Sequence, residues 1–455
     1  MDELKYVTKS IWDKADSKQQ KSMHEYAKKY IKFISENKTE RECIQAVLKR
    51  LQESGFSSDF KKGSYVAVLH NKSLFAVRKG KKDLSHGFRL VTAHCDSPRL
   101  DFKQNPLLEC VGIAQAKTHY YGGILKYQWL ARPLALHGVV VKKSGETVNI
   151  VIGEKASDPV FTISDLLPHL AKEHVTQTVT KAFEAEKLNL IIGHIPYPKK
   201  GKEKPENPIK LQVLKLLNKK YGIIEEDLLS AEIQVVPSGD ARFVGLDQGL
   251  VGGYGQDDRI CVFTALEAFL EVENPEYTTV LMLWDKEEIG SEGTTGASSR
   301  FFEYCMQDTI AAWAPKATMR QVMLAGKAIS ADVHAAIDPD WQELHEKQNS
   351  ATIGYGPTIC KFTGSGGKYG ANDAHPEYIA WLRNIFTEKK IPWQLAALGK
   401  VDHGGGGTVA LFLAVYGMNT IDMGPSLLGM HSPFELSSVA DIFYTKEAYK
   451  AFYSA

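Results

Sequence analysis

Residues 280–293 read VLMLWDKEEIGSEG, and this stretch decides how the rest of the chain is interpreted. An apolar run at 280–284 is followed directly by Asp285, Lys286, Glu287 and Glu288. A continuous apolar run is typical of a buried parallel strand, and open α/β sheets bind their ligands beyond the carboxyl ends of such strands. One glutamate at such a place can bind a metal while its neighbour moves a proton. A solvated acidic turn has the same pattern, so the choice between a turn and a metal-binding strand end depends on the other segments of the chain.

Length and composition define the class of protein. A chain of 455 residues exceeds what one hydrophobic core usually organises, so we expect two domains. The 44% hydrophobic and 24% charged residues are typical of a globular protein. A formal net charge of +1 gives no electrostatic reason to bind nucleic acid or an anionic membrane.

The ends and the cysteines indicate a compartment. The first ten residues, MDELKYVTKS, are polar and lack the basic and then apolar layout of a signal peptide. No run approaches the roughly 18 consecutive apolar residues of a membrane span. The six cysteines are scattered without a CxxC pair, which argues against a zinc ribbon or a disulfide framework. We therefore expect a cytoplasmic protein with reduced thiols, without nucleic acid or membrane as a partner.

The pattern of apolar residues changes twice along the chain. Helical spacing at 17–37, a capping box at Thr39 and Glu42, and a hairpin around 70–73 precede an apolar strand at 90–93. Strand-like segments then dominate residues 107–236, where a lysine- and proline-rich stretch at 199–208 predicts an exposed loop. An α/β pattern returns after residue 245. We predict an α/β catalytic domain from residues 1–104 and 240–455, with a central mixed sheet flanked by helices. A mainly β domain, residues 105–239, is inserted into it.

Candidate metal ligands follow several of these strands. They are His94 and Asp96, Glu287 and Glu288, Asp332, and His431, while Asp257 and Asp258 lie where a glycine-rich loop enters a helix. If the strands share one parallel sheet, all of these side chains meet at the same edge. Two imidazoles and three carboxylates suit two divalent cations with one bridging carboxylate. Such a pair lowers the pKa of a shared water, and a nearby carboxylate that binds no metal takes the proton, which is the chemistry of peptide hydrolysis.

Each of these residues also has a structural interpretation when it is considered alone. His94 could be a core histidine bonded to the backbone, and His431 could belong to an ordinary turn before Ser432 and Pro433. A carboxylate at 257 or 258 could face the positive end of a helix dipole, and for Asp258 we keep this interpretation. The joint arrangement outweighs the separate ones because each ligand set follows its own strand.

Five motifs together resemble a known family. HCDSP at 94–98, GQDDR at 255–259, DKEEIGS at 285–291, SADVHAA at 330–336 and MHSPFE at 430–435 resemble the M18 metallo-aminopeptidases, the aspartyl aminopeptidase and aminopeptidase I family. The motifs stand in the family's order and cover nearly the whole chain. The resemblance implies a phosphorylase/hydrolase-like catalytic domain that removes the amino-terminal residue of peptides.

The resemblance also implies the ligands of two metal ions. His94, Asp257 and Asp332 would hold one ion. Asp257, Glu288 and His431 would hold the other, which makes Asp257 the bridge. Zn²⁺ is the expected metal, and Mn²⁺ and Co²⁺ suit the same ligands.

Two further carboxylates receive catalytic roles by the same resemblance. Glu287 would be the general base for a metal-bridging hydroxide that attacks the scissile carbonyl. Asp96 would orient His94, as metal-bound imidazoles usually require. Asp285 receives no role.

Three positions are expected on the substrate side. His169 resembles a family histidine that reaches a neighbouring subunit's active site, although it could equally be a strand-end histidine of its own domain. Lys368 resembles the family's substrate-side lysine, with a solvated loop lysine as the alternative. The turn at 404–407, beginning with Gly404, would offer backbone N–H groups to the peptide, because close approach needs glycine. The family often carries hydroxyl residues in this turn, whereas here all four residues are glycine.

The last expectations concern the oligomeric state and the alternative functions. The resemblance implies that the inserted domain mediates dimerisation and that dimers assemble into a tetrahedral dodecamer. A related two-metal deacylase or carboxypeptidase would ignore a free α-amine and turn over an N-acetylated peptide. A metal-stabilised peptide-binding assembly would bind metal without cleavage. The sequence leaves open whether the preferred amino-terminal residue is acidic or apolar.

Overall fold

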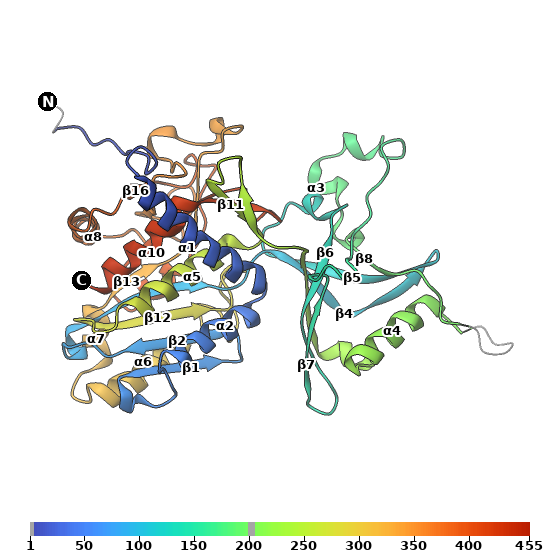
Figure 1. Cartoon of the computed structure of the whole chain (residues 1–455), viewed down its shortest axis with the longest axis horizontal. Coiled ribbons are helices and arrows are strands. Elements are labelled where there is room, and N and C mark those ends of the chain that lie inside the picture. The colour runs from blue at the N-terminus through green and yellow to red at the C-terminus, as the bar shows by residue number, and fades with distance from the viewer. Residues whose placement is uncertain (1–3, 199–204) are drawn as a thin grey trace. The chain divides into compact units, whose positions relative to one another are not determined.

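The computed structural model describes residues 4–198 and 205–455, and the chain forms two compact units (Figure 1). Unit 1 comprises Met1–Ser97, Ala241–Met430 and Phe434–Ala455, and unit 2 comprises Pro98–Asp240 and His431–Pro433. The predicted boundary after residue 104 falls within a strand of unit 2 that begins at Arg99. Most of the predicted loop at 199–208 lies outside the described residues.

A mixed eight-stranded sheet forms the centre of unit 1, in the order β1-β2-β12-β3-β13-β17-β15-β16. Its middle strands β12, β3, β13 and β17 are parallel to one another, whereas β12 is antiparallel to β2 and β17 is antiparallel to β15. This arrangement confirms the predicted central mixed sheet. The strands are β1 (Ser64–Leu69), β2 (Ser73–Arg78), β3 (Phe88–His94), β12 (Thr278–Trp284), β13 (Lys327–Ser330), β15 (Thr358–Cys360), β16 (Gln394–Leu395) and β17 (Asn419–Gly424).

Alternating side chains of the sheet enter two separate hydrophobic cores. In β12, Leu281 and Leu283 join one core, whereas Val280, Met282 and Trp284 join the other. Strand side chains alternate between the two faces of a sheet, so both faces must be covered. Each fully buried Leu, Ile, Val or Phe stabilises the fold by about 1.5–3 kcal/mol.

Helices from distant parts of the chain cover these two faces (Figure 1). The first core is completed by α1 (Ser17–Glu36), α2 (Glu40–Glu53), α5 (Gln256–Glu271), α8 (Pro376–Glu388) and α10 (Val439–Tyr453). The second core is completed by α6 (Phe301–Trp313), α7 (Met319–Ala325) and α9 (Ala410–Ala414). The predicted arrangement of helices on both faces of the sheet is therefore confirmed.

The amino-terminal predictions are confirmed in detail. The helix predicted at 17–37 is α1, and Thr39 caps α2 through a capping box with Glu42. The predicted hairpin is formed by β1 and β2, with His70 and Asn71 at positive φ in its turn. Left-handed backbone is typical of tight hairpin turns, where asparagine tolerates it better than most residues.

Unit 1 also contains a five-stranded sheet that the sequence did not predict, in the order β10-β11-β19-β18-β14. Its strands are β10 (Arg242–Val244), β11 (Leu250–Gly253), β14 (His334–Ala335), β18 (Ser426–Leu428) and β19 (Glu435–Ser438). The antiparallel pair β11 and β19 brings Glu435 opposite Gly253, close to the start of α5.

Unit 2 is built on an antiparallel six-stranded sheet, in the order β7-β6-β9-β4-β5-β8. Its strands are β4 (Arg99–Cys110), β5 (Ile113–Tyr121), β6 (Leu134–Val141), β7 (Thr147–Ile152), β8 (Leu190–Gly193) and β9 (Ala231–Pro237). The helix α4 (Pro208–Tyr221), which the sequence analysis missed, packs Ile209 and Val213 against Ala114. Proline at the first helical turn and glycine just past the end are helix signals. Both were present, at Pro208 and Gly222.

Two further expectations concern membrane spans and the state of the cysteines. Among the described residues, no helix is both long enough and apolar enough to cross a membrane. All six cysteines are free thiols, and five of them are buried.

Candidate metal centre

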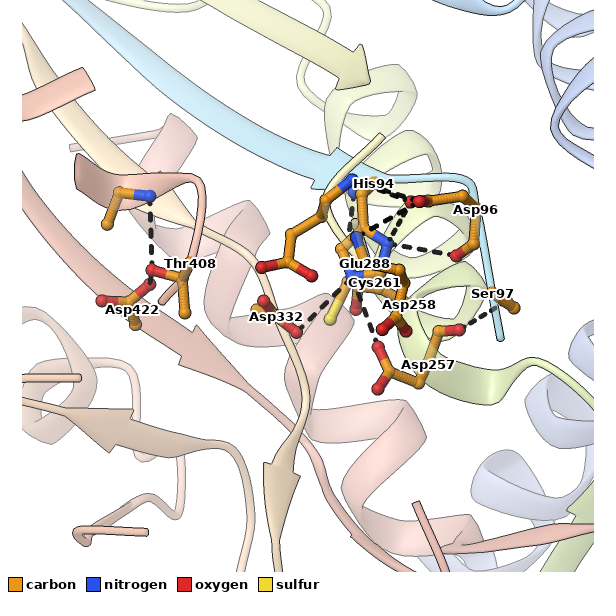
Figure 2. Close-up of polar contacts among 12 residues, drawn as sticks. His94, Asp96, Ser97, Asp257, Asp258, Cys261, Glu288, Asp332, Thr408 and Asp422 are labelled. Carbon is orange, nitrogen blue, oxygen red and sulfur yellow. Dashed lines mark hydrogen bonds and ion pairs between the residues drawn. The ribbon is translucent and has the colours of Figure 1, made fainter. Parts of the chain in front are cut away.

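The candidate ligands of unit 1 come from the ends of three parallel strands and the start of one helix (Figure 2). Trp284, the last residue of β12, pairs with His94, the last residue of β3, so Glu288 follows one strand where His94 ends the next. Strand β13 is parallel to β3 and leads into Asp332. Asp257 lies in the first turn of α5. The parallel register therefore gathers residues that are up to 238 positions apart in sequence.

His94 is at the centre of this cluster and is almost completely buried. Its Nε2 lies 3.3 Å from Asp257 Oδ1 and 3.8 Å from Asp332 Oδ1. Its backbone N–H donates to Asp258 Oδ2 at 3.3 Å. Burial disfavours a charged imidazole, but the hydrogen bonds to Asp257, Asp332 and Asp96 outweigh it and raise the pKa of His94 well above its ordinary value.

Two groups of three side chains are close enough to hold a metal ion. Within each group, the ligand atoms lie within 4.8 Å of one another. The groups are His94, Asp257 and Glu288, and His94, Asp258 and Asp332. Neither group is identical to a predicted trio: the first contains His94 in place of His431, and the second contains Asp258 in place of Asp257.

The donor set and its burial fit a divalent cation. Imidazole nitrogen and carboxylate oxygens are the donors that Zn²⁺ and similar ions take in proteins. Buried carboxylates repel one another, and a cation removes this cost. Burial, reinforced by the charge of Asp332, raises the pKa of Asp258 well above its ordinary value. The buried Oδ1 of Asp258 has no hydrogen-bond partner within the described part of the chain.

The general-base candidate Glu287 lies at the edge of the same cluster. Burial, reinforced by the negative charges of Asp332 and Asp257, raises the pKa of Glu287 to about 8. Burial likewise raises the pKa of Asp332, while His94 opposes the shift. The local charge is therefore strongly negative, which favours either protons or cations.

Asp96 ties the candidate ligands together. Its Oδ1 accepts from His94 Nδ1 at 3.0 Å and from the backbone N–H of Glu287 at 3.0 Å. Its Oδ2 accepts from the backbone N–H of Glu288 at 3.2 Å. One buried carboxylate thus sets both the imidazole orientation and the turn that carries the two glutamates. In the neutral imidazole, this hydrogen bond places the proton on Nδ1 and leaves Nε2 free to bind a metal, and a bound cation favours that form over the protonated one.

Two supporting residues, Ser97 and Glu435, were missed by the sequence analysis, and a third, Asp258, was expected only as a helix-terminal carboxylate. Ser97 Oγ donates to the backbone oxygen of Asp257 at 2.6 Å. Glu435 Oε2 accepts from the backbone N–H of Asp257 at 3.3 Å. The carboxylate of Asp258 is directed at His94, in addition to its position near a helix terminus. Both Ser97 and Glu435 lie inside quoted motifs, so the motifs contained the signal, but not the partner of either residue.

Lys368 and Gly404 lie in exposed turns of unit 1. Lys368 Nζ is 3.0 Å from Asp373 Oδ2 and 4.0 Å from the ring centroid of Phe362. A Cβ on Gly404 would lie 1.9 Å from the backbone oxygen of Leu398, so glycine is required there by contact within the protein. Gly406 and Gly407, in contrast, have open space where a Cβ would be. Those two are the glycines of this turn that a peptide backbone could approach.

Two predicted site residues belong to unit 2. His431 lies at positive φ, with Nδ1 3.0 Å from the backbone oxygen of Gly123. His169 is exposed in a turn. Their roles as metal ligand and substrate contact stay predictions.

Comparison with known proteins supports one family. The family described as aminopeptidase I zinc metalloprotease (M18) matches residues 33–453. A probable M18 family aminopeptidase 1 from Clostridium acetobutylicum is 48% identical, over 98% of this chain and 97% of its own.

Solved structures agree with this match. The crystal structure of an M18 family aminopeptidase from Thermotoga maritima has a TM-score of 0.93 and 45% identity, covering 99% of this chain and 100% of its own. The Saccharomyces cerevisiae mApe1 dodecamer has a TM-score of 0.75 at 20% identity, covering 94% and 95%. The predicted resemblance is confirmed, and the chain belongs to the M18 family of metallo-aminopeptidases.

Proposed function

We propose that this aminopeptidase hydrolyses the amino-terminal peptide bond at a two-metal centre, with Glu287 as the general base. The observation that carries the proposal is the shared carboxylate of Asp96. It holds the imidazole of His94 and the backbone of both glutamates at once, so a metal-binding group and a proton carrier are fixed relative to each other.

The metal ligands are assigned from the same cluster. His94, Asp257 and Asp332 would hold one ion, and Asp257, Glu288 and His431 the other. When bound, two Zn²⁺ ions lower the pKa of a water that they share and stabilise the charge that develops on the scissile carbonyl. The proximity of Asp258 to His94 and Asp332 supports a role beside the first ion, as an additional acidic neighbour.

Glu287 moves the proton in this proposal. The Glu287 carboxylate makes no hydrogen bond to another side chain among the described residues, so it is available to the attacking water. It takes a proton from that water and gives it to the amine that leaves. A general acid–base group of this kind accelerates a reaction by about 10²- to 10⁴-fold.

Substrate contacts are assigned to three positions. Lys368 would meet the side chain or carbonyl of the amino-terminal residue, the turn beginning at Gly404 would offer backbone N–H groups, and His169 would reach the site of a neighbouring subunit. The ion pair of Lys368 with Asp373 offsets part of its charge. Both an acidic and an apolar preference therefore stay open.

The remaining assignments concern architecture. We assign residues 1–104 and 240–455 to a phosphorylase/hydrolase-like catalytic domain and residues 105–239 to dimerisation. Dimers would assemble into a tetrahedral dodecamer, as the yeast protein of the same fold forms a dodecamer. The six free thiols favour a reducing compartment, and we assign the enzyme to the cytoplasm.

The proposed function is tested with matched peptides. Aspartyl-, glutamyl- and leucyl-peptides are supplied with a free or an acetylated α-amine, in the presence of Zn²⁺, Mn²⁺ or Co²⁺, and the released residue is measured. We expect turnover of free peptides only, with about two metal ions per chain in the active enzyme. Turnover of acetylated peptides would instead identify a deacylase or carboxypeptidase, and metal binding without cleavage would identify a binding assembly.

A further inference from the structure

Two turns of unit 1, to which the proposed function assigns substrate contacts, are joined through their backbones. We call residues 361–373, which carry Lys368, the lysine turn, and residues 403–408 the glycine turn. The backbone N–H of Gly364 donates to the backbone oxygen of Gly406 at 2.6 Å. A Cβ on Gly405, which has a φ of +108°, would lie 1.6 Å from the backbone oxygen of Gly364. The two turns therefore touch closely at Gly364 and Gly405, where neither residue has room for a side chain, so we expect a displacement of one turn to move the other.

Both turns are fastened to the same strand of the central sheet. Asn372 Nδ2, in the lysine turn, donates to the backbone oxygen of Thr420 in β17 at 2.8 Å. Thr408 Oγ1, at the end of the glycine turn, donates to Asp422 Oδ1 in β17 at 2.7 Å. The same hydroxyl accepts from the backbone N–H of Ala410, where α9 begins, at 3.3 Å. Figure 2 shows the side chain of Thr408 directed at Asp422.

The strand that holds the turns also adjoins a strand of the metal centre. Asp422 pairs with Ser330 across the parallel ladder of β17 and β13, and β13 leads directly into Asp332. The substrate turns and a candidate metal ligand are thus linked through one pair of neighbouring strands. Figure 2 shows Asp422 and Asp332 on these two neighbouring segments.

A carboxylate at position 422 lowers the stability of the fold unless its burial is compensated. It is buried, and burial raises its pKa to about 7, while the hydroxyls of Thr408 and Ser330 lower it. Buried carboxylates destabilise a fold unless hydrogen bonds compensate them. An apolar residue would fill the position at lower cost, so the carboxylate calls for an explanation, and the side chain that donates to it from outside the strands is Thr408.

We propose that Asp422, acting through Thr408, is the positioning residue that sets the glycine turn, and with it the lysine turn, for substrate binding. This inference rests on the proposed function, because it assigns a support to the substrate contacts named there. It adds Asp422, Thr408 and Asn372 to the residues that determine substrate affinity, although none of them is assigned a contact with the substrate.

The test removes the hydroxyl of Thr408 while keeping the shape of the side chain. Thr408→Val deletes the donor, Thr408→Ser keeps it, and Asn372→Asp removes the donor that fastens the lysine turn. Thr309→Val is the control, because Thr309 is a buried threonine whose Oγ1 also donates at 2.7 Å, but to a backbone oxygen within α6. For each variant, KM and kcat for free peptides, bound zinc, and backbone hydrogen exchange in the two turns are measured.

Thr408→Val is expected to raise KM roughly tenfold, the lower end expected for a lost hydrogen bond to a charged group, while kcat changes less than about threefold. Bound zinc stays equal to wild type, hydrogen exchange accelerates in both turns, and Thr408→Ser restores the KM. Asn372→Asp is expected to raise KM in the same direction.

Three outcomes would overturn the inference. These are a KM of Thr408→Val no higher than that of Thr309→Val, a loss of kcat at unchanged KM, and a loss of zinc. Failure of the proposed function itself is separate, because it appears in the wild-type enzyme as an absence of aminopeptidase turnover.

Discussion

The metal centre and the two substrate turns are held in place by different means. Three candidate ligands of the centre, His94, Glu288 and Asp332, lie at or just after the ends of β3, β12 and β13, which are adjacent strands with almost entirely buried side chains, and Asp257 lies at the start of α5. The turns are largely exposed and are fastened to the sheet by two side-chain hydrogen bonds. The positions needed for bond cleavage are therefore fixed by the backbone ladder of the sheet. The positions that recognise the substrate depend on a few replaceable side chains.

This difference predicts different kinetic consequences. Damage within the centre should reduce kcat or metal content, because its groups act on the reacting atoms or hold the metals. Damage to the turns should raise KM and alter the preferred residue, with kcat less affected. The following variants probe this contrast, beginning with the largest expected effect.

Replacing Glu287 by glutamine should have the largest effect. Glu287→Gln keeps the shape of the side chain and removes its ability to carry a proton, so kcat should fall about 10²- to 10⁴-fold. Bound zinc should remain at the wild-type level, because Glu287 is assigned no ligand role. Glu292→Gln, an exposed glutamate of the same loop, is the control and should be fully active. Full activity of Glu287→Gln with both metals present would refute the assignment of the base.

Replacing Asp96 by asparagine should have the next largest effect. The amide presents one oxygen where the carboxylate presents two, so one of the contacts to His94, Glu287 or Glu288 is lost. Loss of such a support for a metal ligand typically reduces metal affinity or activity by about 10- to 100-fold. Zinc affinity is measured by competition with a chelator. The control is Asp59→Asn, which changes a turn aspartate bonded to Lys61. Equal zinc affinity and activity in both variants would contradict a role of Asp96 in the centre.

The contrast between the regions also explains what the sequence could predict. Strand ends were predictable because an apolar run followed by a charged residue marks the point where a buried strand ends, as at Trp284 and Asp285. The order of strands in the sheet was not, because nothing local in the sequence specifies that β12 lies beside β3. The predicted convergence of the ligands was therefore conditional on one shared sheet. The parallel ladder of β12, β3 and β13 supplies that condition for His94, Glu288 and Asp332, while the place of His431 stays a prediction.

The supports within each site escaped the sequence analysis for a related reason. Glu435 and Ser97 form hydrogen bonds with the backbone of Asp257. Every residue has a backbone N–H or C=O group, so the residue type at position 257 does not indicate which side chains bind its backbone. In the glycine turn, by contrast, the sequence did contain a signal, but the signal did not identify the atoms that approach the glycines. Its glycines do indicate close approach, yet for Gly404 and Gly405 the approaching atoms belong to Leu398 and Gly364.

Lys368 gives the smallest expected effect and the sharpest test of the difference between the regions. It is partly exposed and already paired with Asp373, and exposed ion pairs contribute at most about 1 kcal/mol, or roughly fivefold in affinity. Lys368→Met should therefore raise KM for aspartyl-peptides by about fivefold or less and leave KM for leucyl-peptides nearly unchanged. kcat and bound zinc should not change.

Lys361→Met is the matched control. Lys361 forms a second ion pair with Asp373, with Nζ 3.7 Å from Oδ1, but this residue precedes the glycine-rich part of the lysine turn. If Lys368 recognises an acidic residue, the ratio of aspartyl to leucyl turnover falls in Lys368→Met and not in Lys361→Met. An equal change in both variants would mean that the lysines act only through the charge of Asp373. A fall in kcat instead of a rise in KM would place Lys368 with the reacting atoms, and the separation between a rigid centre and a replaceable recognition surface would then fail at this residue.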